Sequence, residues 1–374
     1  MDAVVHGCGH DGEFLYTPRD SALAQKIRAG ERPFTIDLHC HIATPAVEML
    51  VKDTPQKQAE PAIRVQQFGE KSSLVNAKIF SSDIMRARLA NIDTRLNEME
   101  AMGVDLQLVS ASPGQYYYWA DYDLAAEIVR LQNENIAEVC AKYPKQFLGL
   151  GAVAPQHPEL AVAQLETAVT RYGLKGLIIS THVGDKDLSD PSYEKFWAKA
   201  EELNAVIFIH PLGSPLGERI NSHYLGNIIG QPIETTIALS KLIFDGVLDR
   251  YPALKLLAAH GGGYLPAYIG RTDHGYAVRP EIDRLKQKPS DYLKQIYFDN
   301  LVYKPEAVQA LIAEVGLSQV VVGTDYPFDM GQYAVHEVVD AIDGLTEAEK
   351  ALIFSGNAAR LLNLEFDSKL IGFT

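Results

Sequence analysis

Residues 34–41 read FTIDLHCH, an apolar strand pattern that ends in two histidines one residue apart. Side chains on a strand alternate between its faces, so His39 and His41 point to the same side, about 6–7 Å apart along the strand. Two imidazoles placed in this way can share one metal ion, each at about 2.0–2.1 Å. A doubly wound open sheet usually carries a glycine-rich phosphate turn after its first strand instead. The histidine pair therefore favours a closed barrel.

Seven further apolar runs follow this stretch, with longer amphipathic segments between them. The runs are VDLQLVSAS (104–112), FLGLGAVAP (147–155), GLKGLIISTH (173–182), AVIFIHP (205–211), LKLLAAHGGG (254–263), IYFDNLV (296–302) and VVVGTDYPF (320–328). In residues 157–173, for example, apolar side chains recur at roughly helical spacing. Strands that alternate with helices form a parallel sheet, and a closed barrel needs eight of them. We therefore predict a single (β/α)8 TIM barrel of the α/β class.

Two segments lie outside this repeating pattern. Residues 1–33 are polar and irregular, so we predict an N-terminal extension there and a metal-dependent barrel over residues 34–374. Residues 50–90 are the main irregular insertion, and they follow the first strand, where active-site lids often lie. The start of the chain lacks the pattern of a signal peptide, and no run of about 18 apolar residues predicts a membrane span.

The composition excludes several classes of partner. Hydrophobic residues make up 47% and charged residues 22% of the chain, as in an ordinary globular protein. The net charge of −14 argues against nucleic acid or an anionic membrane surface as a partner. It does not argue against an anionic substrate, because a site can be locally positive. The three cysteines have no spacing typical of a zinc site or a disulfide framework, so we predict a cytoplasmic protein.

Histidine or aspartate lies at or near the C-terminal end of five of the eight runs. These residues are His39, His41, His182, His210, His260 and Asp325. The C-terminal strand ends of a barrel form one rim, so we expect these side chains to converge. An ionised carboxylate such as Asp325 is costly at an apolar barrel mouth unless it is paired, hydrogen-bonded or bound to metal. The pattern predicts His39, His41, His210 and Asp325 as metal ligands.

The pattern allows two roles for each of the other two rim histidines. His260 begins the run HGGG and could be a fifth ligand or a free acid or base beside the metal; we favour the second. Asp325 could also accept a proton, so we predict His260 and Asp325 as the catalytic residues. His182 could contact the substrate or could be structural.

The motifs IDLHCH, FIHP, AAHGGG and VVGTDYPF, in that order, resemble the amidohydrolase superfamily. They are most similar to the aminocarboxymuconate-semialdehyde decarboxylase family, which also includes decarboxylases of hydroxybenzoates. The resemblance extends from about residue 34 to 365. It implies the same four metal ligands and makes His260 the free catalytic histidine. No lysine ends the fourth strand run, so we predict a mononuclear site rather than one with a carboxylated lysine between two metals.

The resemblance also implies how the substrate is held. Arg95 would bind the substrate carboxylate, Arg271 would be donated by the neighbouring subunit, and Phe328 would pack against the substrate. The active site would then be complete only in a homodimer. Arg95 could instead be a surface residue paired with Glu98 three positions later. Leu212 stands where the family usually has a tryptophan, so we expect a different substrate pocket.

We therefore predict a metal-dependent non-oxidative decarboxylase, a carboxy-lyase, acting on an aromatic or muconate-like carboxylic acid as its small-molecule partner. One Zn2+ per chain, or alternatively Mn2+, would act as a Lewis acid. The alternative is a metal-dependent hydrolase of a lactone, ester or amide, or a hydratase, that uses the same site. Decarboxylation releases CO2 and adds no water oxygen to the product, whereas hydrolysis does add it.

Overall fold

The computed structural model describes residues 32–283 and 285–364, and these residues form a closed barrel of eight parallel strands. The strands are β1 (Ile36–Ile42), β2 (Leu106–Ala111), β3 (Phe147–Gly149), β4 (Gly176–Ile179), β7 (Val206–Ile209), β8 (Lys255–Ala258), β9 (Ile296–Asp299) and β10 (Val320–Val321). Seven of these strands lie within a predicted run, and β1 extends one residue beyond its run, to Ile42. The predicted N-terminal extension falls almost entirely on residues 1–31, outside the described residues.

Parallel pairing runs around the whole barrel. Hydrogen-bonded ladders give the orders β1-β2-β3 and β10-β9-β8-β7-β4. Parallel bridges close both gaps, one between Gly151 and Leu177 beside β3 and β4, and one between Asp37 and Val322 beside β1 and β10. The predicted (β/α)8 barrel is confirmed. A small antiparallel hairpin, β5 (His182–Val183) with β6 (Lys186–Asp187), follows β4 and stands apart from the barrel ladders.

Helices occupy the connections between the strands. Between β1 and β2 lie α2 (Pro45–Val51), α3 (Pro55–Phe68), α4 (Glu70–Ser81), α5 (Asp83–Ala90) and α6 (Ile92–Met102). The remaining helices are α7 (Tyr122–Lys142), α8 (Pro158–Thr170), α9 (Glu194–Glu202), α10 (Gln231–Phe244), α11 (Val247–Arg250), α12 (Ile269–Val278), α13 (Pro289–Tyr292), α14 (Pro305–Val315), α15 (Val335–Asp340), α16 (Glu347–Ala351) and α17 (Asn357–Leu362). Short 3-10 and π turns join several of them.

The helix α7 illustrates how the sequence builds this outer layer. The side chain of Asp121 caps its first turn by accepting a hydrogen bond from the backbone of Leu124. Ala125, Ile128 and Ile136 recur on one face and are buried against the barrel. The opposite face carries charged residues, so amphipathic spacing alone predicts which side covers the strands.

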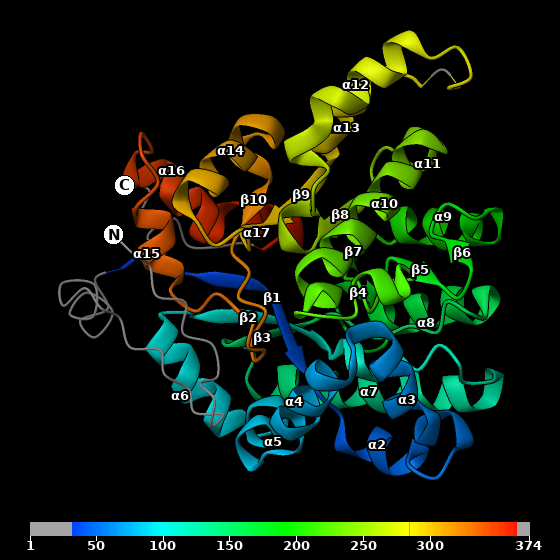
Figure 1. The fold of residues 1–374 in the computed structure, drawn as a ribbon. Helices are drawn as coiled ribbons and strands as arrows, with labels where there is room; N and C mark the ends of the chain where they lie inside the picture. The colour runs from blue at the N-terminus through cyan, green and yellow to red at the C-terminus, as the bar shows by residue number, and fades with distance from the viewer. Residues whose placement is uncertain (1–31, 284, 365–374) are drawn as a thin grey trace.

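The insertion after β1 is helical rather than irregular, which corrects the prediction for residues 50–90. The side chains of Thr54 and Ser82 cap α3 and α5. Neither α3 nor α4 buries a side chain, so neither helix packs an apolar face against the barrel core. Figure 1 shows α2 to α5, in blue and cyan, at the end of the barrel toward which the β1 arrow points.

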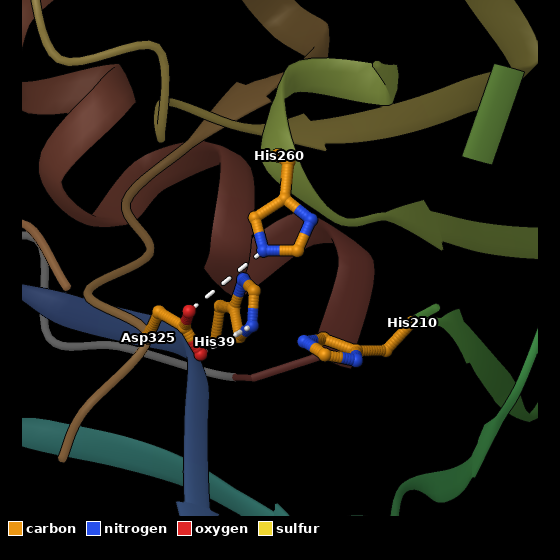
Figure 2. A group of neighbouring side chains, drawn as sticks. All are labelled: His39, His210, His260 and Asp325. Atoms are coloured by element: carbon orange, nitrogen blue, oxygen red, sulfur yellow. Dashed lines mark ion pairs between the residues drawn. The ribbon is translucent and has the colours of Figure 1, made fainter. Parts of the chain in front are cut away.

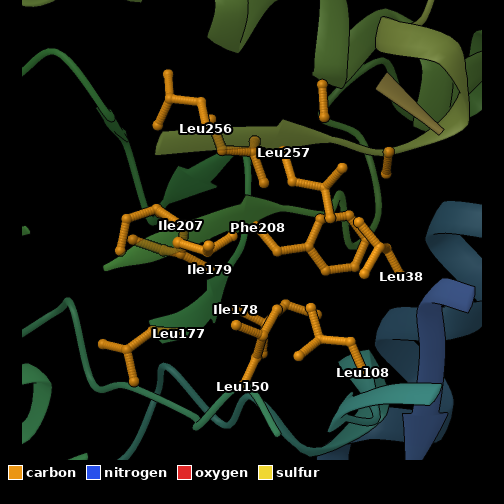
Figure 3. Close-up of a cluster of buried hydrophobic side chains, with 14 of the residues drawn as sticks. Leu38, Leu108, Leu150, Leu177, Ile178, Ile179, Ile207, Phe208, Leu256 and Leu257 are labelled. Atoms are coloured by element: carbon orange, nitrogen blue, oxygen red, sulfur yellow. The ribbon is translucent and has the colours of Figure 1, made fainter. Parts of the chain in front are cut away.

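Consecutive strand residues are buried because the barrel interior covers one face of the sheet and the helices cover the other. Figure 3 shows this core, in which Leu38, Leu108, Leu150, Leu177, Ile178, Ile179, Ile207, Phe208, Leu256 and Leu257 are almost completely inaccessible to solvent. Phe208 lies inside the barrel, with its ring centroid 4.8 Å from that of His39. It therefore forms apolar packing beside the rim histidines. Within the described residues, no helix combines the length and apolarity needed to cross a membrane.

Candidate metal centre

Four side chains from separate strands meet at the rim of the barrel. His39, His210, His260 and Asp325 each offer one ligand atom, and these atoms lie within 4.8 Å of one another. Figure 2 shows the four side chains converging from different elements. His39 lies on β1, and the other three follow β7, β8 and β10 directly or within a few residues. Four of the six side chains that we expected to converge therefore meet at this rim.

His41, the other predicted ligand on β1, belongs to the same group. Its Nε2 atom lies 3.2 Å from Nε2 of His39 and 3.2 Å from Oδ1 of Asp325. Oδ1 of Asp325 is also 3.2 Å from Nε2 of His39. Ligand atoms held tetrahedrally at about 2.0–2.1 Å from one ion are separated by roughly 3.3–3.4 Å. The two β1 histidines and Asp325 are therefore spaced like ligands of a common ion.

Backbone geometry sets the directions of the two rim residues that follow β8 and β10. His260 and Asp325 both have φ = 55°, a left-handed conformation that is uncommon for residues with a side chain. The amide of Asp325 donates a hydrogen bond to the carbonyl of His39 at 2.7 Å, which ties the β10 loop to β1. After His260, a Cβ on Gly263 would lie 2.1 Å from the carbonyl oxygen of Pro232, so only glycine fits the chain's close approach to α10.

Unsatisfied buried atoms indicate that the group is built for a cation. Both ring nitrogens of His210 are buried, and neither has a hydrogen-bond partner among the described residues. Leaving such groups unpaired is costly, and a metal ion is a partner that a neutral imidazole can take. Three imidazoles and one carboxylate form a donor set suited to Zn2+ or a similar divalent ion. The residues present therefore fit a mononuclear metal site.

The electrostatics of the group agree with this assignment. Burial lowers the pKa of His41 to about 4 and the pKa of His210 well below its usual value, so both are neutral at pH 7 and have free lone pairs. Burial also opposes the charged form of His39, yet Asp325 and Asp299 raise its pKa to about 10. Burial would raise the pKa of Asp325, but the charge of His39 and hydrogen bonds hold it well below its usual value. The centre therefore favours positive charge, which a divalent cation supplies.

Asp299 orients His39 and was not singled out from the sequence. It lies at the end of β9, and its Oδ2 atom is 2.7 Å from Nδ1 of His39. The same carboxylate accepts hydrogen bonds from the backbone amides of His260 at 2.9 Å and Gly261 at 2.8 Å. A metal-binding histidine commonly donates its second N–H to a carboxylate in this way. The available signal was the aspartate within the apolar run IYFDNLV, which ends the strand β9 on the same rim.

Arg95, predicted to hold the substrate carboxylate, is 1% exposed and bonded to the protein itself. Its guanidinium donates to the side chain of Gln107 at 2.9 Å and to the backbone carbonyls of His41 and Arg88. These hydrogen bonds position the end of β1. They do not support a contact between Arg95 and the substrate carboxylate, which stays a prediction. The alternative pairing with Glu98 is not formed either, because Glu98 pairs with Arg88 at 2.9 Å.

Arg271 lies on α12, where its side chain is exposed and makes no ion pair with the described residues. Only Ile269 of this helix is buried, and Figure 1 shows α12, in yellow, projecting away from the barrel. The contact of Arg271 with a second subunit stays a prediction. The geometry leaves the guanidinium available for such a contact.

Phe328 and His182, the other two predicted substrate contacts, lie in different settings. The ring centroid of Phe328 is 5.3 Å from that of His41, so this aromatic side chain adjoins a predicted ligand. Nδ1 of His182 is 3.1 Å from Oε2 of the buried Glu234, which also accepts a hydrogen bond from Ser214. The His182 side chain remains 28% exposed. Both predicted roles for His182 therefore stay open.

Comparisons with known proteins agree with the geometry. The family model described as Amidohydrolase matches residues 36–364, which contain every residue of the metal centre. The 2-amino-3-carboxymuconate-6-semialdehyde decarboxylase of Dictyostelium discoideum is 34% identical over 275 residues, covering 73% of this chain and 77% of the relative. The gamma-resorcylate decarboxylase of Rhodococcus jostii is 28% identical over 302 residues, covering 76% of this chain and 91% of the relative.

A solved structure adds a comparison of the fold. The dihydroxybenzoic acid decarboxylase of Polaromonas sp. JS666, with bound manganese and the inhibitor 2-nitroresorcinol, matches with a TM-score of 0.72 and 25% identity. The match covers 90% of this chain and 99% of that structure. The similarity therefore extends over nearly the whole of both barrels.

Proposed function

Because this chain belongs to the amidohydrolase family, we propose that it is a metal-dependent non-oxidative decarboxylase of an aromatic or muconate-like carboxylic acid. The observation that carries the proposal is the buried convergence of His39, His41, His210 and Asp325 beside His260. Its relatives from Dictyostelium and Rhodococcus are decarboxylases of a carboxymuconate semialdehyde and a resorcylate, which supports this reaction class.

His39, His41, His210 and Asp325 would hold the metal, as one ion per chain. Zn2+ suits the donor set, and Mn2+ is the alternative because the Polaromonas structure contains it. When bound, such an ion stabilises negative charge that develops on substrate oxygen as the C–C bond breaks.

His260 is the proposed proton donor. Its Nε2 atom faces Oδ2 of Asp325 at 3.8 Å, beyond hydrogen-bond distance, and a reacting group placed between them could contact both. Loss of CO2 leaves an electron pair on the substrate carbon, and a proton from His260 would complete the product there. Asp325 would hold His260 and the substrate in the orientation that this transfer requires.

The single test of this proposal is CO2 release by the metal-loaded protein from a panel of hydroxybenzoates and muconate-like carboxylates. We expect release that stops when a chelator removes the metal and resumes when the metal is restored. If protein that holds about one metal per chain releases no CO2 from any acid of the panel, decarboxylation is contradicted. Hydrolysis or hydration then becomes the proposed reaction. Incorporation of labelled oxygen from water into the product would then identify that chemistry.

The proposal includes a homodimer in which Arg271 reaches the partner's site and binds the substrate carboxylate through charge-assisted hydrogen bonds. The exposed position of Arg271 on the projecting helix α12 supports it. Mixing inactive Arg271→Ala chains with inactive His260→Ala chains should restore activity, because one site of a mixed dimer then receives both intact residues. A mixed dimer that stays inactive would contradict the contact between subunits.

A further inference from the structure

A helical hairpin crosses the barrel mouth above the metal centre. It consists of α3 and α4, residues 55–81, joined at Gly69, and is called the strap below. The strap follows β1, and its turn packs against the loop that follows His210 at the end of β7. A Cβ on Gly69 would lie 1.8 Å from the carbonyl oxygen of Asn221, and a Cβ on Gly226 would lie 2.7 Å from the Phe68 ring.

The positions of β1 and β7 explain why this path crosses the mouth. Going around the barrel, β7 is the fourth strand from β1 in either direction, through β2, β3 and β4 or through β10, β9 and β8. Opposite strands of an eight-stranded barrel face each other across its axis. The turn of the strap reaches the loop after β7, and its α4 end returns to Phe328 after β10, so the strap spans the rim where the metal ligands converge.

The strap places an aromatic side chain beside this rim. The ring centroid of Phe80, on α4, is 5.8 Å from that of Phe328, with an angle of 58° between the ring planes. Phe328 in turn adjoins the metal-ligand histidine His41, with ring centroids 5.3 Å apart. Phe80 is 38% exposed although it contacts Phe328. The two rings thus form an aromatic corner that connects a partly exposed side chain of the strap to a ligand of the metal centre.

Polar contacts hold the strap in this position. Nζ of Lys57, on α3, is 2.7 Å from the hydroxyl of Tyr117, 3.1 Å from Glu48 and 3.0 Å from Glu60. Its ammonium group also lies 4.6 Å from the centroid of the Tyr117 ring, in cation–π geometry. Tyr117 follows β2 and Glu48 lies on α2, so these contacts join the strap to fixed parts of the barrel.

We propose that Phe80 is a specificity-determining residue whose ring packs against a planar aromatic carboxylate bound at the metal centre. The inference rests on the proposed function for the position of the substrate. An aromatic ring in the corner would meet Phe328 on one side and Phe80 on another, in the offset or edge-to-face contacts that aromatic pairs prefer. An open-chain acid presents no ring face and gains less from Phe80. The strap thus selects aromatic acids over muconate-like acids.

The test uses the metal-loaded, full-length protein with salicylate as the aromatic probe and muconate as the open-chain probe. Titration calorimetry gives each dissociation constant without requiring turnover. Phe80→Ala should weaken salicylate binding about three- to tenfold and muconate binding less, with unchanged metal content. Phe80→Tyr, which keeps the ring, should bind salicylate like the unmodified protein. The matched control is Leu74→Ala, which removes an apolar side chain that is 65% exposed on the same helix.

Two results would overturn this role of Phe80. One is a loss of salicylate affinity in Phe80→Ala that does not exceed the loss of muconate affinity in the same variant, or the loss of salicylate affinity in Leu74→Ala. The other is failure of both probes to bind the unmodified protein. For any acid that the protein decarboxylates, the substitution should raise KM with little change in kcat, because Phe80 contacts the ring and not the carbon that loses CO2. Ring-dependent binding without CO2 release would support the role of Phe80 and contradict decarboxylation.

Discussion

The metal centre lies at the rim of the barrel and the strap lies above it, and the two are held in different ways. His39, His41, His210 and Asp325 are buried and supported by paired strands, while α3 and α4 bury no side chain. A residue fixed by strands keeps the sub-ångström placement that metal binding needs. A residue on a loosely packed helix can change without disturbing the core. Chemistry and substrate preference are therefore assigned to regions of different stability.

The comparison predicts the largest effect for a ligand of the metal centre. His210→Ala removes an imidazole with two unsatisfied buried nitrogens, so we expect loss of the bound metal and a loss of activity beyond the roughly 10–100-fold typical of residues that only orient a ligand. Metal content by atomic spectroscopy checks this. His223→Asn is the control, because His223 is exposed and asparagine tolerates its positive φ. Full metal retention by His210→Ala would exclude His210 as a ligand.

A second prediction separates the two roles left open for His260. If His260 is the proton donor, His260→Ala should retain the metal and lose about 10²–10⁴-fold in kcat. Metal content and kcat are measured on the same preparation. Near-normal turnover would remove His260 from the mechanism, whereas loss of the metal would make it a fifth ligand.

A third prediction concerns the carboxylate that orients His39. Asp299→Asn keeps the shape of the side chain but removes the charge that lies 2.7 Å from Nδ1 of His39, so metal affinity should fall about 10–100-fold. Competition with a chelator measures that affinity. Asp343→Asn makes the same chemical change at an exposed position and should leave it unchanged. Equal affinities in the two variants would show that Asp299 does not support the metal.

The smallest effect is expected for the attachment of the strap. Lys57→Met keeps the length of the side chain but removes its charge, which should lower the free energy of unfolding by about 1 kcal/mol or less. The metal content should not change, because Lys57 contacts α2, α3 and the segment after β2 rather than the rim ligands. Denaturant unfolding measures the effect, with the exposed Lys71→Met on α4 as control. Loss of metal from Lys57→Met would contradict the division between the two regions.

Much of the barrel could be predicted from local pattern. Each of the eight apolar runs contains a strand, and the rim aspartate and histidines follow from the rule that parallel strands end on one side. These inferences succeed because strand alternation, helical spacing and polar residues at strand ends are properties of short segments. The helices α3 and α4 were not predicted in the same way, because neither of them buries apolar side chains against the barrel.

The residues alone predict the barrel, the family and the side chains at the rim. Which of these side chains touch, and what supports them, depends on how the chain folds in three dimensions. Folding places Asp299 against His39, which lies 260 residues away in the sequence. It also buries Arg95 against the backbone of β1 and brings Phe80 of the strap to Phe328. The physical reason is that such contacts depend on barrel closure and on the path of an insertion. Neither barrel closure nor the path of an insertion produces a periodic sequence pattern at the residues that come into contact.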